Sequence, residues 1–148
     1  MLNSLQMALC DTQGQLFELA AERGYAREAF VKVYMTSAVA ADMDKEFHHI
    51  QWAGKAYILS RMEDELSDQL IKDGEIYDKE ALYWMGYIYR YWHFYTGESS
   101  REIYKQAPAK TMNVVYLMYH TMSPEMAIDR LRESYSIDDK TAGEMHND

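Results

Sequence analysis

Apolar residues recur three and four positions apart along most of the chain, which is the period of an α-helix with one buried face. In the first segment Leu5, Leu9 and Leu16 carry this pattern, and Gly24 follows where helix ends favour glycine. Polar caps, glycines and prolines divide the rest of the pattern into separate helices. The predicted helices span residues 4–23, 26–40, 45–62, 78–96, 100–106 and 108–120, and a last one begins at Pro124.

The helix predicted at residues 45–62 places its large apolar residues on a face that we expect to pack into the core. Asp42 or Asp44 precedes this helix and can accept hydrogen bonds from its free N–H groups. The apolar residues of this helix are Phe47, Ile50, Trp52, Ala53, Tyr57, Ile58 and Met62.

Aromatic side chains dominate the segment from Tyr83 to Tyr95, where they make up eight of 13 residues. The flanks favour a helix, because Asp78 can cap its start, Gly97 can end it, and about 18 residues is too long for a usual strand. Apolar side chains cover most of its circumference, which is typical of a helix buried on most sides. We therefore predict an all-α, single-domain bundle of about five to seven helices around this central aromatic helix.

Five of these eight aromatic residues are tyrosines, and each hydroxyl needs a hydrogen-bond partner or water. Tyr and Trp at such density also favour a protein interface or a pocket wall. Both interpretations can hold on different faces of the helix. The residues predicted to contact a partner are Tyr83, Trp84, Tyr87, Tyr91, Trp92 and Tyr95.

Two segments lack a regular apolar pattern. Residues 63–79 carry seven acids and only two lysines, and the Asp73-Gly74 pair is a helix-breaking signal. The last residues, 136–148, are polar. We therefore predict one helical domain at residues 1–135, with a mobile acidic connection at 63–79 and a disordered tail at 136–148.

The overall charge narrows the choice of partner. A net charge of −9 argues against nucleic acid and anionic membranes, since both are bound through Lys and Arg. The chain also has no apolar run of about 18 residues that could span a bilayer. A partner protein with a basic surface fits better, and the aromatic face could alternatively form a homodimer. The single cysteine, Cys10, cannot form an internal disulfide, so we expect a reducing, cytoplasmic compartment.

Motifs for catalysis are sparse. Glu46 and His49 form one E-x-x-H pattern, whereas a carboxylate-bridged di-iron site needs a second one. His93 and His120 could carry a proton near neutral pH, but no nucleophile motif or phosphate-binding loop accompanies them. We therefore predict no metal and no cofactor, and we favour a non-catalytic role over an enzyme.

The aromatic helix, the TGESSREIY that follows it at 96–104, and YHTMSPE at 119–125 resemble a family of small, functionally uncharacterised, all-helical bacterial proteins. With residues 21–59, the resemblance covers most of residues 20–130. The C-terminal pattern is also similar to a second small helical family. Members of such families tend to lie in operons that look like toxin–antitoxin or mobile-element modules, some with ADP-ribosyltransferase-like toxins. The resemblance implies an antitoxin-like or accessory binding role, and no catalytic residue can be carried over from it.

Three functional hypotheses follow. The first is a cytoplasmic, antitoxin-like or accessory protein that binds and neutralises a partner protein. The second is a small-molecule or enzymatic pocket lined by tyrosines, with His93 or His120 as the proton carrier. The third is an acidic, phage-type inhibitor whose carboxylates mimic the phosphates of nucleic acid.

Overall fold

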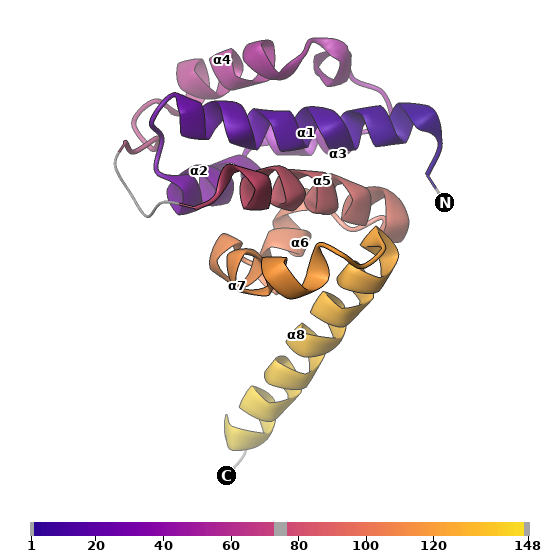
Figure 1. The fold of residues 1–148 in the computed structure, drawn as a ribbon. Helices are drawn as coiled ribbons and strands as arrows, with labels where there is room; N and C mark the ends of the chain where they lie inside the picture. Colours follow the sequence, from indigo (N-terminus) through magenta and orange to yellow (C-terminus); the bar gives the residue numbers. More distant parts are fainter. Residues whose placement is uncertain (1, 73–76, 147–148) are drawn as a thin grey trace.

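The computed structural model describes residues 2–72 and 77–146, with side chains up to residue 139 (Figure 1). Among these residues there is no β-strand, which confirms the all-α class. They form eight α-helices and one 3-10 helix: α1 (Ser4–Glu22), α2 (Arg27–Met35), α3 (Ala38–Asp44), η1 (His49–Trp52), α4 (Lys55–Leu66), α5 (Lys79–Thr96), α6 (Ser100–Gln106), α7 (Ala109–Tyr119) and α8 (Pro124–His146).

Two glycines bring α1 and α5 together at close range, side by side in Figure 1. A Cβ atom added to Gly86 would lie 2.5 Å from the carbonyl oxygen of Gln13, and one added to Gly14 would lie 2.7 Å from the Tyr83 ring. Gln13 Nε2 also donates a 2.9 Å hydrogen bond to the carbonyl oxygen of Gly86. The lack of a side chain at both glycines therefore sets how closely the two backbones approach.

Helix α5 also packs against α6, α7 and α8. Its buried residues lie on several sides of the helix and include Met85, Tyr89 and Trp92. The Tyr89 hydroxyl donates to the carbonyl oxygen of Ala107 at 2.6 Å, so this buried ring satisfies its polar atom.

Three polar residues and one glycine mark helix boundaries. Asp78, Ser99 and Ser123 each accept a hydrogen bond from a backbone N–H in the first turn of α5, α6 and α8. Gly97 ends α5 with a φ of 80°, a left-handed conformation that glycine adopts without strain. Asp42 and Asp44, the predicted caps of a helix at 45–62, lie within α3 instead, and the next helical turn is capped by His48.

The helix predicted at residues 26–40 is two helices, α2 and α3. The Ser37 hydroxyl accepts a hydrogen bond from the Ala40 N–H at 3.2 Å and donates to the carbonyl oxygen of Tyr34 at 2.6 Å. A serine used in this way is an N-cap, so the chain bends there and a new helix begins.

The helix predicted at residues 45–62 is also wrong in its first half. The chain from Lys45 to His48 is not helical, η1 follows, and Gly54 with a φ of 91° separates η1 from α4. Helical spacing therefore does not apply across this segment. Ile50, Ile58 and Met62 are buried as expected. The side chains that are exposed instead are Phe47, Trp52, Ala53 and Tyr57.

The C-terminal helix α8 extends away from the other helices (Figure 1). Its helix reaches His146, so it includes residues 136–146 of the segment that we predicted to be disordered, and the side chains of residues 136–139 are exposed; residues 147 and 148 lie outside the described residues. A polar sequence is compatible with a helix that solvent surrounds. The predicted mobile connection at 63–79 includes residues 73–76, which lie outside the described residues.

Candidate functional site

A fully buried arginine, Arg90, forms hydrogen bonds with side chains from three other helices. Arg90 is 0% exposed. Its Nη1 donates to Asp44 Oδ1 at 2.7 Å, its Nε and Nη2 donate to Gln13 Oε1 at 3.1 and 2.9 Å, and Nη2 lies 3.3 Å from the Ser100 hydroxyl. A buried charge is tolerated only when it is paired and hydrogen-bonded, and Arg90 meets both conditions.

This buried network links five helices. Asp44 at the end of α3 accepts hydrogen bonds from the Ser100 N–H at 2.8 Å and the Ser100 hydroxyl at 2.7 Å, at the first residue of α6. The Tyr34 hydroxyl of α2 donates to Gln13 Oε1 of α1 at 2.7 Å, and Arg90 belongs to α5. The position of Asp44 is therefore fixed from several sides.

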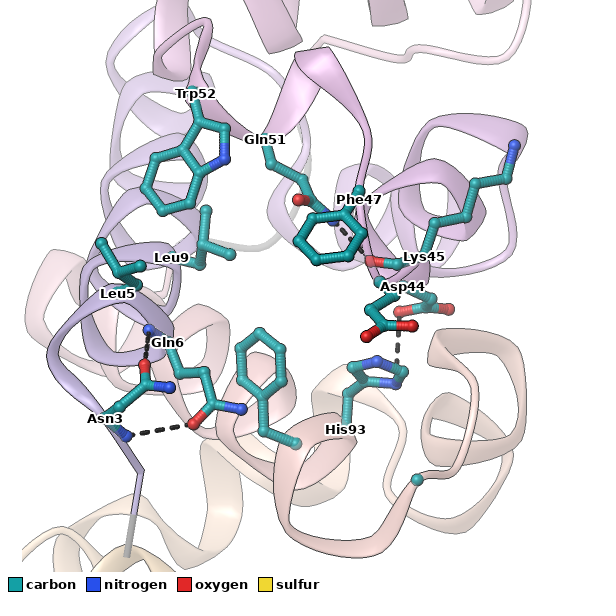
Figure 2. Close-up of a pocket in the computed structure, with 13 residues that line it drawn as sticks. Asn3, Leu5, Gln6, Leu9, Asp44, Lys45, Phe47, Gln51, Trp52 and His93 are labelled. Carbon is teal, nitrogen blue, oxygen red and sulfur yellow. Dashed lines mark hydrogen bonds and ion pairs between the residues drawn. The ribbon is translucent and has the colours of Figure 1, made fainter.

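His93 lies at the edge of the same network. Its Nδ1 is 2.7 Å from the carbonyl oxygen of Glu98 and 3.7 Å from Asp44 Oδ1. A carbonyl oxygen only accepts hydrogen bonds, so Nδ1 carries a proton, and in the neutral ring Nε2 is left as an acceptor. The geometry assigns a tautomer to His93 and orients its ring toward Asp44 (Figure 2).

A groove of about 690 Å³ opens beside Asp44 and His93. It lies between the first turns of α1, the segment from Lys45 to Trp52 and the end of α5, and we call it the η1 groove (Figure 2). Within the described chain no hydroxyl or thiol side chain lines it. The apolar side chains that surround it are Leu5, Leu9, Phe47, Trp52 and Phe94.

Three of these apolar side chains are unusually open to solvent. Leu5 is 65% exposed, Phe47 85% and Trp52 57%. The segment that carries Phe47 is held in place by Gln51, whose Nε2 donates to the carbonyl oxygens of Lys45 at 2.6 Å and Met43 at 3.2 Å. A fixed backbone thus presents large apolar groups outward, where burial against another molecule would stabilise a complex.

A second groove, of about 670 Å³, lies along the first half of α5. Three predicted contact residues, Tyr83, Trp84 and Tyr87, line it, and His120 lies at its edge after α7. We call it the tyrosine groove. The two candidate histidines therefore lie in different grooves, His93 in the η1 groove and His120 in the tyrosine groove, and they do not form one site.

Two of the predicted contact residues, Tyr91 and Trp92, are buried in the structure. Tyr91 is 6% exposed and its hydroxyl donates to Glu125 at the start of α8. Trp92 is 0% exposed and its Nε1 donates to Glu98 at 2.9 Å. Both rings are buried, so neither ring is an exposed anchor. Tyr95, by contrast, is 43% exposed.

Carboxylates accept hydrogen bonds from many of the tyrosine hydroxyls. Tyr83 donates to Asp11, Tyr91 to Glu125, and Tyr25 to Glu63 at 2.6 Å. Burial, together with the adjacent carboxylate, raises the pKa of Tyr83 and of Tyr91 well above the usual value. The excess of acids and the density of tyrosines thus partly explain each other, since each supplies the partner that the other needs.

The candidate site includes residues that the sequence does not predict as site residues. Arg90 is one, and the exposed side chains of Phe47 and Trp52 are the others. Gly54, inside the helix predicted at 45–62, is the signal that could have identified Phe47 and Trp52 as exposed, because an interior glycine weakens a helix. No comparable signal marks Arg90, whose partners lie far away in the sequence.

Among the described residues no group of three or more His, Cys, Asp or Glu side chains is arranged to hold a metal ion. Glu46 and His49 are both exposed, and the His49 ring stacks on His48 at 4.5 Å. Within the same part of the chain, no helix has the length and apolar character needed to cross a bilayer.

No protein-family model, curated protein or solved structure matches the chain. The resemblance to small bacterial helical proteins therefore stays a prediction.

Proposed function

We propose that this protein is a non-catalytic binding module that docks a partner protein in the η1 groove, in an antitoxin-like or accessory role. One observation carries the proposal: Leu5, Phe47 and Trp52 are all largely exposed around one hollow. Tryptophan and other aromatic anchors dominate the binding energy of protein interfaces. Isolated exposed apolar residues are common on protein surfaces, but a group of them around a groove is typical of an interaction site.

The buried network supports docking because it stiffens the groove. Asp44 is held by Arg90 at 2.7 Å and by both polar groups of Ser100, and it lies where α3 leads into the groove wall. A wall that is already ordered loses little conformational entropy when a partner binds.

The charge around the η1 groove favours a basic partner. Lys45 is paired with Asp42 at 2.8 Å, and its amine points away from the hollow (Figure 2). Glu46 is exposed, and no ion pair to it occurs among the described residues. With a net charge of −9 for the whole chain, a basic protein surface would approach faster than a neutral or acidic one.

The cellular setting comes from the sequence. A bacterial, antitoxin-like role follows from the resemblance, and the single cysteine, Cys10, is consistent with a reducing cytoplasm. The proposal assigns His93 no proton transfer, since no hydroxyl or thiol of the described chain shares its groove.

The test begins with tagged protein isolated from its own host, from which a stoichiometric partner is identified and then purified. Calorimetric titration of that partner compares the wild type with Trp52→Ala and with Tyr57→Ala, an exposed aromatic residue outside the groove. We expect Trp52→Ala to weaken the Kd by about 30-fold, which corresponds to about 2 kcal/mol. Tyr57→Ala should change it by less than about threefold. Equal loss in both variants would overturn the assignment of the η1 groove.

A further inference from the structure

The tyrosine groove has an aromatic lining that is distinct from the η1 groove. Trp84 and Tyr116 meet edge to face, with ring centroids 5.7 Å apart and planes at 64°. Tyr83 and Tyr87 lie 6.1 Å apart at 34°. The His120 ring stacks on Tyr116 at 4.6 Å. Rings from α5 and α7 thus form differently oriented walls around one hollow of about 670 Å³.

Aromatic faces attract cations, because the ring quadrupole places negative charge above and below the plane. The hydroxyl of Tyr83 donates a hydrogen bond to Asp11, which does not line the groove, and this bond holds the ring in place. Ile88, Met122 and Pro124 complete the lining and add apolar surface. A cation carrying methyl or methylene groups could contact both kinds of surface at once.

Two carboxylates stand at the same groove. Glu18 and Glu80 line it, and in the described part of the chain no Lys or Arg side chain does so. Lys79, the basic residue next to Glu80, forms an ion pair with Glu22 instead, at 2.9 Å. Neither Glu18 nor Glu80 forms an ion pair with another described residue.

Burial is the main influence on the carboxylate of Glu18. Burial raises the pKa of Glu18, the positive charges of Lys55 and Lys79 oppose this, and the negative charges of Glu22 and Asp11 add to it. The net effect is a raised pKa, so the carboxylate would gain from a further cation nearby.

We propose that the tyrosine groove binds a small soluble organic cation of the alkylammonium class. The charged nitrogen lies against the Trp84, Tyr87 and Tyr116 rings and near Glu18 and Glu80, and the alkyl part packs on the apolar lining. This site is separate from the docking of a protein in the η1 groove, so either proposal can fail without the other.

The experiment uses choline and its neutral isostere 3,3-dimethylbutan-1-ol, which have the same shape but differ in charge. Each is titrated into the full-length protein while the indole N–H signals of the tryptophans are followed by NMR, with Trp84 assigned from Trp84→Phe. We expect choline to shift the Trp84 signal and to bind at least about tenfold more tightly than the alcohol. Glu80→Gln, an exposed and isosteric change, should weaken choline by about threefold or more.

Two control variants separate the groove from the rest of the surface. Glu133→Gln removes an exposed acid on α8, and Tyr57→Leu removes an exposed ring on α4. Neither should change choline binding. No shift of Trp84 with choline up to about 10 mM, ten times a weak Kd of about 1 mM, would overturn the proposal. Equal binding of choline and the alcohol would do so as well. Tighter binding of N-acetylarginine amide, whose cation is a guanidinium, than of choline would overturn the alkylammonium class and reassign the groove to an arginine of a protein segment.

Discussion

The guanidinium of Arg90, fully buried, donates a 2.7 Å hydrogen bond to Asp44 at the point where α3 ends and the wall of the η1 groove begins. Asp44 therefore belongs both to the buried network and to the wall of the candidate docking surface. Loss of the pair would affect both the stability of the fold and the shape of the groove.

Arg90→Met tests the energetic weight of this pair. The change leaves Asp44 partly buried without its cation and removes two donors from Gln13 Oε1. We expect the free energy of unfolding to fall by about 3–5 kcal/mol, as when one partner of a buried ion pair is removed. Urea denaturation followed by circular dichroism measures it. Arg130→Met on the exposed face of α8 is the control, and a similar effect of both variants would contradict the role given to Arg90.

Gly86→Ala tests the close approach of α1 and α5. Alanine favours a helix by about 1 kcal/mol over glycine, but here its Cβ would lie 2.5 Å from the carbonyl oxygen of Gln13. We expect a net loss of about 1–3 kcal/mol from overpacking in the same denaturation assay. Gly24→Ala separates this steric effect from backbone strain, because Gly24 has a φ of 84° and no atom within 4 Å of an added Cβ. A more stable Gly86→Ala protein would refute the proposed contact.

Tyr91→Phe tests the hydrogen bond to Glu125. That bond holds the pKa of Glu125 below its usual value, since the hydroxyl of Tyr91 stabilises the charged carboxylate. A carboxyl group whose pKa is lowered on folding stabilises the protein above its unfolded pKa of about 4.3, and this contribution disappears as the pH falls through the folded pKa. The wild type should therefore be more stable than Tyr91→Phe at pH 7 by about 1 kcal/mol. The difference should shrink toward pH 3, and a difference independent of pH would argue against this assignment.

The acids of α4 and its C-terminal end test electrostatic steering. Glu63 forms an ion pair with Arg23 and accepts a hydrogen bond from Tyr25, whereas Asp64 and Asp68 are exposed to solvent. The double variant Asp64→Asn/Asp68→Asn should lower the association rate of a basic partner by about two- to fivefold at low salt, with the dissociation rate unchanged. Stopped-flow or biolayer kinetics at two salt concentrations measure this. Association that does not depend on salt would exclude steering.

The sequence predicted those parts of the fold that depend on local chemistry. Asp78, Gly97, Ser99 and Ser123 act on backbone groups within one turn, so their effect can be recognised without knowing the tertiary structure. Ser37 acts in the same way, but its helical spacing from Phe30 and Tyr34 predicts one continuous helix across it.

The candidate site could be predicted only in part, because it depends on distant contacts. Gln13 and Asp44 meet Arg90 across 77 and 46 residues of sequence, and only these partners make burial of the arginine acceptable. Phe47 and Trp52 were assigned to the core, because helical periodicity was extended through a segment that is not helical. Apolar character alone does not distinguish a core residue from an exposed anchor.

Site-specific photocrosslinking at position 52 tests the central claim most directly. A photoreactive phenylalanine analogue replaces Trp52 in one strain and Tyr57 in another, and the protein is irradiated in its native host. We expect position 52 to crosslink to one protein with a basic surface and position 57 to give no such product. The absence of a crosslink at 52, equal products at both positions, or a crosslink to a second copy of this chain would contradict docking of a partner protein in the η1 groove.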